Sequence, residues 1–284
     1  MSRWRAWCMA ARPATLPAAA VPVVVGSALA LADGRWRPLA GLAALVSALL
    51  IQIGTNFAND LFDYRKGADT SGRLGPTRVT QAGLLAPKAV AVGTAVTFGS
   101  AFAVGLYLVH IGGWPILAIG LAGIAAGVLY TAGPWPYGYH GLGELFVFVF
   151  FGLAAVIGTY YVHTATVTPL AVWTALPIAC LVTGILVVNN LRDIDTDRAA
   201  GKRTLAVRLG ERPTRWLYAA LVCIAYVIGV GIVWLPIVSA PLAWRLVRDV
   251  LGGASGPALN GVLSRTGRLE LVFGLLMAIG YTAL

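Results

Sequence analysis

Charged side chains are scarce in this chain of 284 residues: they make up 11% of it, and only eleven are acidic. A soluble domain carries about a quarter charged residues. A chain that is 58% hydrophobic, with a mean hydropathy of +0.80, is therefore not an ordinary soluble protein. Most of its length divides into apolar stretches of about the 20 residues that a spanning helix needs. Because the alternation of a membrane β-barrel is absent, we predict an all-α integral membrane protein with a single domain over residues 1–284.

Cysteine and histidine are also rare, with three of each. Cys8, Cys180 and Cys223 have no paired spacing, so a disulfide framework or a zinc site is not expected. The histidines show no metal-ligand spacing. The chain also lacks a P-loop and the GxSxG, CxxC and HExxH motifs. These absences remove the common nucleotide-binding, serine hydrolase, redox and zinc-dependent sites from consideration.

The apolar stretches predict nine membrane-spanning helices. They are 14–32, 38–60, 88–110, 114–132, 142–162, 169–190, 214–233, 235–250 and 268–284. With a cytoplasmic N-terminus, only Arg35 and Arg37 among the lysines and arginines fall on the outer side, as the positive-inside rule requires. The net charge of +10 then reflects orientation, and no nucleic-acid partner is expected. We predict a multi-pass protein of a bacterial plasma (inner) membrane.

Six of the eleven acids form two clusters, each where a predicted span meets a cytoplasmic loop. One lies in NFANDLFDYRKGAD (56–69) and the other in NNLRDIDTD (189–197). On a continuing helix, two stripes of side chains each share a face: Asn56, Asp60 and Asp63, and Asn190, Asp193 and Asp197. Magnesium takes one or two carboxylates together with substrate phosphates. Two facing stripes therefore predict a site that binds a diphosphate through metal ions. A lone acid in such a place would more simply neutralise loop arginines.

Further candidates lie close to these clusters. A leaving diphosphate needs cations, and the candidates in the loops are Arg73, Arg78, Lys202 and Arg203. Many arginines in cytoplasmic loops, however, serve only to orient the protein in the membrane. Glu144 lies just inside a span, where an acid indicates function. The aromatic segment around Tyr130 suits either a carbocation or an interfacial belt. Asp195 points away from its stripe, so we expect it to face water or pair with an arginine.

The motifs Asn59-Asp60-x-x-Asp63 and Asp193-x-x-x-Asp197 resemble those of the UbiA-type intramembrane aromatic prenyltransferases. Segments 11–30, 56–83, 129–152 and 189–210 look like the subfamily that acts on 1,4-dihydroxy-2-naphthoate. The resemblance implies nine transmembrane helices in a bundle around a central cavity, open to the cytoplasmic side and to lipid. It implies two magnesium ions on the four aspartates, assisted by asparagines: Asn56, Asn59 and Asn190. Many members carry a third acid four residues after the second. Here Gly67 occupies that position, and Asp69 follows.

The activity implied by this resemblance is magnesium-dependent prenyl transfer. A polyprenyl group passes from polyprenyl diphosphate to 1,4-dihydroxy-2-naphthoate with loss of carbon dioxide and diphosphate, which gives demethylmenaquinone for menaquinone biosynthesis. Tyr130 would contact the diphosphate or the allylic cation, and Glu144 would orient or deprotonate a ring hydroxyl. The acid clusters would bind only the diphosphate and therefore do not identify the acceptor. 4-Hydroxybenzoate or a glycerol phosphate remains an alternative acceptor. A transporter is less favoured, because the acids lie at span ends. Prenyl chain length and oligomeric state stay open.

Overall fold

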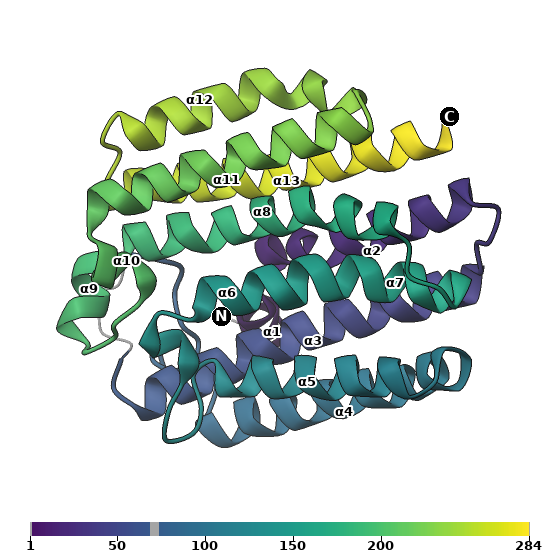
Figure 1. Cartoon of the computed structure of the whole chain (residues 1–284). Coiled ribbons are helices and arrows are strands. Elements are labelled where there is room, and N and C mark those ends of the chain that lie inside the picture. Colours follow the sequence, from purple (N-terminus) through teal and green to yellow (C-terminus); the bar gives the residue numbers. More distant parts are fainter. Residues whose placement is uncertain (1, 69–73, 284) are drawn as a thin grey trace.

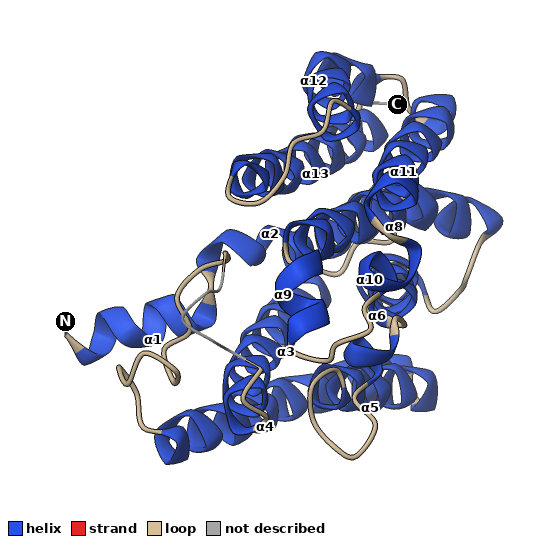
Figure 2. Ribbon diagram, turned by 90° about the vertical axis from the view of Figure 1, so that its left-hand side faces the viewer, coloured by secondary structure: helices blue, strands red, loops and turns tan. Residues whose placement is uncertain are grey.

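The computed structural model describes residues 2–68 and 74–283, and every regular element in these ranges is a helix. Figure 1 shows the long helices side by side along one common direction, with the short helices α9 and α10 at one end of the bundle. Figure 2 looks onto that end and shows α1 lying outside the bundle. Asp69 and Arg73 fall outside the described residues, so the predictions for them are not addressed.

Most of the predicted spans coincide with helices, but α13 begins at Ala258, ten residues before the predicted start at 268. In chain order the elements are α1 (Arg3–Ala11), η1 (Pro13–Thr15), α2 (Pro17–Ala32), α3 (Pro38–Arg65), α4 (Pro87–Gly112), α5 (Trp114–Leu129), η2 (Tyr137–His140), α6 (Gly143–Val147), η3 (Phe148–Ala154), α7 (Ala155–Thr164), α8 (Pro169–Arg192), α9 (Ile194–Ala199), α10 (Leu205–Leu209), α11 (Glu211–Ile232), η4 (Leu235–Ser239), α12 (Ala240–Leu251) and α13 (Ala258–Thr282). Several begin at a proline, where the missing N–H costs little.

Helix length and composition support a multi-pass membrane protein. Five of the described helices are long and apolar enough to cross a bilayer, and a sixth span results if the bent pair Arg3–Thr15 and Pro17–Ala32 counts as one. Each of the nine predicted ranges contains a helix, but α5 has only 16 residues and α12 only 12. The number of nine crossings therefore stays a prediction.

Helix α8 is the central element of the bundle. It packs against α11, α13 and η3, and 72% of its most apolar window is buried. Small residues allow the close helix contacts that membrane bundles use. A Cβ at Gly274 of α13 would lie 2.2 Å from Val21 of α2, and one at Gly229 of α11 would lie 2.5 Å from Phe273. These contacts fix the helices that surround the cavity described below.

A π-helix, η3, interrupts the helix formed by α6 and α7. The residues of this helix that line the cavity come in adjacent pairs, and the pairs recur every four residues. The first pair is Phe146 and Val147, and the last is Gly158 and Thr159. At 3.6 residues per turn, each four-residue step drifts by about 40° around an α-helix. The wider turn of a π-helix opposes that drift. The π-helix therefore keeps one face of the helix formed by α6, η3 and α7 directed towards the cavity along the whole length of that helix.

Gly152 allows this π-helix to lie directly on α8. A Cβ at Gly152 would be 2.1 Å from the Cβ of Ala179, far inside contact distance. We expect Gly152→Ala to lower the free energy of unfolding by about 1–3 kcal/mol, as overpacking does. The measurement is thermal unfolding in detergent. Gly99→Ala is the matched control, because its Cβ would meet nothing within 4 Å and helix propensity favours alanine. Equal unfolding temperatures for both variants would contradict this account.

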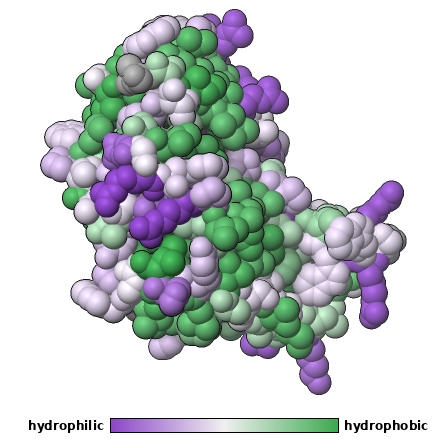
Figure 3. Space-filling view, turned by 90° about the vertical axis from the view of Figure 1, so that its right-hand side faces the viewer, coloured by the Kyte–Doolittle hydropathy of each residue, from purple (hydrophilic) through white to green (hydrophobic). Residues whose placement is uncertain are grey.

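The two ends of the bundle differ in chemistry. The end with α9 and α10 carries both acid clusters and most of the basic residues. Figure 3 looks onto the opposite end, where apolar and weakly polar side chains cover most of the surface and hydrophilic ones form small groups. The α2–α3 connection, with Arg35 and Arg37, belongs to this second end. The predicted orientation would place the end with α9 and α10 in the cytoplasm.

Candidate functional site

A cavity of about 920 Å³ lies among α2, α3, α4, α5, α7, α8 and α13. Three of the predicted aspartates line its polar end: Asp63, Asp193 and Asp197. Mostly apolar side chains line the remainder, as far as Leu108 and Ile116, with a few polar ones such as Gln52 and Thr55 among them. Phe102 and Leu106 of α4 belong to the lining and are 42% and 50% exposed. The cavity therefore joins a charged pole to an apolar chamber.

Asp63 is the centre of a buried charge network. Its Oδ2 accepts from Arg78 at 2.9 Å, and its Oδ1 accepts from the hydroxyl of Tyr139 at 2.6 Å and from Lys202 at 3.3 Å. The Lys202 ammonium also lies 4.6 Å from the centre of the Tyr139 ring. Lys202 follows the second acid cluster in sequence, so this contact brings the two clusters together.

Lys66 approaches the same ring from the loop after α3, at 5.1 Å from the ring centre of Tyr139. Partial burial lowers the pKa of the Lys66 ammonium, an effect that Asp63 opposes. Lys66 also donates to the carbonyl of Gly133 at 3.2 Å. The polar end of the cavity therefore gathers at least three cations around one carboxylate: Lys66, Arg78 and Lys202.

Asp193 pairs with its own neighbour, Arg192. The guanidinium donates from Nε at 2.8 Å and from Nη2 at 2.6 Å to the two carboxylate oxygens. Arg192 also donates to Asn189 and to Asn260 of α13, and Asn260 in turn donates to the carbonyl of Leu74. Arg192 thereby connects α8, α13 and the loop after α3. Because it is bidentate and buried, this pair fixes the orientation of the Asp193 carboxylate.

Asp60 lies differently from the other three predicted metal ligands. It is 2% exposed and does not line the cavity. Its two oxygens accept the backbone N–H groups of Val79 at 3.0 Å and Thr80 at 2.9 Å. Asp60 therefore anchors the start of the segment that leads into α4, immediately after Arg78. In this structure the Asp60 carboxylate holds the loop in place through these two backbone hydrogen bonds.

The second stripe is less regular than predicted. Helix α8 ends at Arg192, and α9 begins at Ile194, so the stripe does not lie on one continuous helix. Asp197 is half-buried and lines the cavity. Asp195 is exposed and pairs with Arg198 at 3.2 Å, as expected for an acid that points away from the site. Arg203 is exposed and lies outside the cavity lining, whereas its neighbour Lys202 faces the cavity.

The predicted amides and Glu144 occupy three separate places around the cavity. Asn56 donates to the carbonyl of Ala11 and to the hydroxyl of Thr15. Asn59 accepts from Thr131 at 3.0 Å. Asn190 donates to Oε1 of Glu144 at 2.9 Å. All three asparagines line the cavity, whereas Glu144 lies behind Asn190, so it reaches the cavity only through that amide.

Tyr130 lines the cavity with its ring held between two glycines. A Cβ at Gly138 would be 3.0 Å from the ring, and one at Gly143 would be 3.3 Å from it. The ring also packs edge-on against Tyr137, with centroids 5.4 Å apart. This fit fixes where the phenol faces the cavity, since larger side chains at either glycine would displace it.

Several side chains at the site were missed by reasoning from the sequence. Arg192 was overlooked because side chains one residue apart point in different directions on a regular helix, and here the helix ends between them. Tyr139 was seen only as one aromatic among many, and Asn260 had no local signal at all. In each case the partner is distant in sequence or the helix is interrupted.

The donor set fits magnesium bound jointly with a substrate. Among residues 2–68 and 74–283, no three His, Cys, Asp or Glu side chains form a group that could hold a metal ion by itself. Magnesium, however, usually takes one or two carboxylates and fills its shell with waters and substrate phosphates. Asp63, Asp193 and Asp197 could each serve in this way. Unpaired, the buried carboxylates would be costly, and basic side chains now neutralise Asp63 and Asp193.

Comparisons with known proteins identify relatives of this chain in sequence and in fold. The chain is 40% identical over 287 residues to a 1,4-dihydroxy-2-naphthoate octaprenyltransferase of Mycobacterium tuberculosis, covering 98% of this chain and 97% of that protein. The Escherichia coli protein of that name is 37% identical over 295 residues, covering 99% and 96%. The fold is similar to a UbiA homologue from Archaeoglobus fulgidus bound to GPP and Mg2+, with a TM-score of 0.67 and 13% identity over 98% of this chain and 100% of that one.

The family model of the UbiA prenyltransferases matches residues 19–254, which include both acid clusters and the aromatic segment. The resemblance seen in the two aspartate motifs is thereby confirmed. Because this match covers most of the length and the curated relatives align nearly end to end, the chain belongs to the UbiA prenyltransferase family.

Proposed function

We propose that this protein transfers a polyprenyl group from polyprenyl diphosphate to 1,4-dihydroxy-2-naphthoate, the step of menaquinone biosynthesis that gives demethylmenaquinol, the reduced form of demethylmenaquinone. The observation that carries the proposal is a single cavity that joins an acid-and-base cluster to a long apolar chamber. An anionic head with an apolar tail fits both parts at once. The relatives that share the chain from end to end are named for this acceptor, which supports the choice of acceptor.

The diphosphate binds at the polar end. Asp63, Asp193 and Asp197 would hold magnesium, in the proposal two ions, and bound magnesium would neutralise the diphosphate and stabilise its developing charge. Arg78 and Lys202, now paired with Asp63, are placed to donate to phosphate oxygens. Asn56, Asn59 and Asn190 would assist from the cavity wall. Asp60 contributes by anchoring the segment that follows Arg78, and the exposed Arg203 adds only distant charge.

The reaction begins when the bond between C1 of the prenyl chain and the diphosphate oxygen breaks, giving an allylic cation and diphosphate. Tyr130 and the phenylalanines that line the cavity, Phe146, Phe150 and Phe151, offer ring faces to the cation without forming a bond to it. The electron-rich naphthoate ring attacks C1, and loss of its carboxylate as carbon dioxide restores the aromatic ring. Glu144 accepts from the Asn190 amide and so orients a ring hydroxyl through Asn190, its hydrogen-bonded partner.

The prenyl chain occupies the apolar chamber and enters from the bilayer. Exposed lining side chains on α4, Phe102 and Leu106, support a lateral route. In this proposal the protein crosses a bacterial plasma membrane with nine helices, and the polar end of its cavity opens to the cytoplasm. Charge asymmetry between the two ends supports this orientation.

The direct test is product mass spectrometry on purified protein in detergent with lipid. We expect 1,4-dihydroxy-2-naphthoate, an allylic diphosphate and magnesium to give a prenylated, decarboxylated naphthoquinol. EDTA should abolish this product, because the aspartate carboxylates can bind the diphosphate only through a shared magnesium ion. If only 4-hydroxybenzoate gives a prenylated product, the proposed diphosphate site is supported and the proposed acceptor is wrong. Undiminished product in EDTA would contradict the metal requirement.

A further inference from the structure

Gln52 presents an unused hydrogen-bond acceptor to the cavity. This side chain lies on α3, lines the cavity and is 8% exposed. Its Oε1 is buried and has no hydrogen-bond partner among the described residues. Buried acceptors are nearly always paired, because an unpaired one forfeits its hydrogen bond to water. An oxygen of this kind in a cavity wall is suited to a ligand that brings a donor.

The direction of the Gln52 amide follows from its neighbours. The Thr15 hydroxyl donates its proton to the carbonyl of Arg12 at 2.9 Å, so its oxygen can only accept from other groups. It accepts from Nδ2 of Asn56 at 3.1 Å and from Nε2 of Gln52 at 3.0 Å. Asn56 cannot be reversed, since its Nδ2 also donates to the carbonyl of Ala11.

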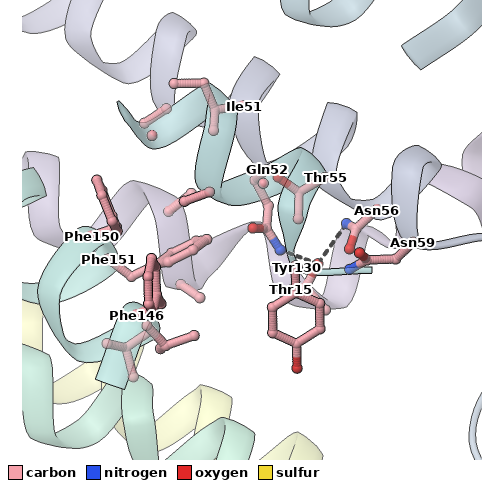
Figure 4. A pocket seen from close by; sticks show the side chains of 18 of the residues that line it. Thr15, Ile51, Gln52, Thr55, Asn56, Asn59, Tyr130, Phe146, Phe150 and Phe151 are labelled. Atoms are coloured by element: carbon pink, nitrogen blue, oxygen red, sulfur yellow. Dashed lines mark hydrogen bonds between the residues drawn. The ribbon is translucent and has the colours of Figure 1, made fainter. Parts of the chain in front are cut away.

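These contacts leave only one orientation for Gln52, with its nitrogen on Thr15 and its oxygen free. Figure 4 shows both amide nitrogens directed at Thr15 and the Gln52 oxygen on the other side, towards the labelled phenylalanines. The network that fixes Gln52 therefore also aims its acceptor atom into the cavity.

A stack of aromatic rings forms the facing wall. Tyr137 and Phe146 are stacked with centroids 4.0 Å apart at 21°, and Phe146 and Phe150 are 5.9 Å apart at 23°. Figure 4 places Phe146, Phe150 and Phe151 together, across the cavity from Gln52 and Tyr130. The π-helix described above turns Phe150 and Phe151 to this side. A flat aromatic ligand would pack well on such a wall.

The distance from Gln52 to the charged pole suits an aromatic acceptor. Eleven residues of α3 separate Gln52 from Asp63, which is about 16 Å at 1.5 Å per residue. A diphosphate and a bicyclic ring placed in line take up a length of this order. The ring would then lie next to the reacting C1 and reach Gln52 with its far edge.

We infer that Gln52 is the residue that selects a hydroxylated aromatic acceptor: the ring stacks on the wall of Phe146 and Phe150, and one ring hydroxyl donates to Oε1 of Gln52. This inference rests on the proposed function, since it names how that acceptor is recognised. A site built to pair with a hydroxyl rejects the analogue that lacks it, because the buried oxygen is then left unpaired.

The test is equilibrium binding to protein in nanodiscs, which needs no turnover. The probes are 1,4-dihydroxy-2-naphthoate and the 1-hydroxy and 4-hydroxy analogues, each of which lacks one hydroxyl. We expect wild type to bind one analogue about tenfold more weakly than the dihydroxy compound, in line with one lost hydrogen bond. Gln52→Met should bind the dihydroxy compound about tenfold more weakly and show no further loss with that analogue.

Two variants in η3 provide the second arm. Phe150→Leu should weaken binding of all three probes, because it removes a ring from the wall. Phe148→Leu is the matched control, since Phe148 packs on the core side of the same π-helix and is not part of the cavity lining. It should keep wild-type affinities. Thermal unfolding of each variant verifies that it is folded.

The outcomes separate this inference from the proposed function. If Gln52→Met binds all three probes like wild type, or loses the same factor for each, the inference is overturned even when wild type makes the expected product. If the hydroxyl-specific loss is found but wild type makes no prenylated naphthoquinol, the inference stands and the proposed reaction falls.

Discussion

Asp193→Asn is expected to lower prenyl transfer by about 1,000-fold, the upper range for loss of a single electrostatic contact in an active site, while the protein remains folded. The carboxylate would lose its charge and its capacity to share a metal ion with the diphosphate. Asparagine is preferred over alanine, because its oxygen still accepts from the buried Arg192 guanidinium. Removing that partner entirely would cost about 3–5 kcal/mol of stability.

The control for this variant lies two residues away. Asp195→Asn removes the same charge from the same segment, but Asp195 is exposed and pairs with Arg198 at the surface. Turnover should stay within about twofold of wild type, because exposed pairs contribute little. The measurement is initial rate of naphthoquinol formation together with thermal unfolding. Near-normal rates for Asp193→Asn would remove the basis for a metal site at this cluster.

The sequence predicted the fold and the polar end of the cavity because both depend on short-range patterns. Apolar runs locate the helices, and the spacing of Asp63 from Asn56 and Asn59 places all three on one side of α3. The positions of Asp193 and Asp197 in the cavity lining agree with the prediction.

The remaining features depend on contacts that no local pattern encodes. Asp60 shares the helical stripe of Asp63, but its oxygens are taken by N–H groups nineteen and twenty residues later. The π-helix over Phe148–Ala154 needs the contact of Gly152 with α8, which belongs to a different part of the chain. Gln52 had no role in the sequence analysis, and its amide is oriented by Thr15, which also accepts from Asn56. Distant partners decide each of these cases.

The role of Asp60 provides a sharp test of loop anchoring against direct metal binding. Asp60→Asn keeps the size of the side chain but replaces one acceptor oxygen by an NH2 group, which faces a backbone N–H of Val79 or Thr80 and cannot pair with it. An unsatisfied buried donor costs about 1–3 kcal/mol. We therefore expect a lower unfolding temperature even in EDTA, together with loss of prenyl transfer, because Arg78 adjoins the released segment.

Limited proteolysis reports on the same segment directly. Arg78 is 6% exposed in the native protein and should resist trypsin, but release of the Val79–Thr80 anchor should make cleavage after Arg78 rapid. Asp195→Asn again serves as the control, with wild-type cleavage. A direct metal ligand would behave in the opposite way, since without metal its loss should leave stability and cleavage unchanged. Unaltered unfolding in EDTA, combined with abolished turnover, would therefore return Asp60 to the metal site and show that its backbone contacts are dispensable.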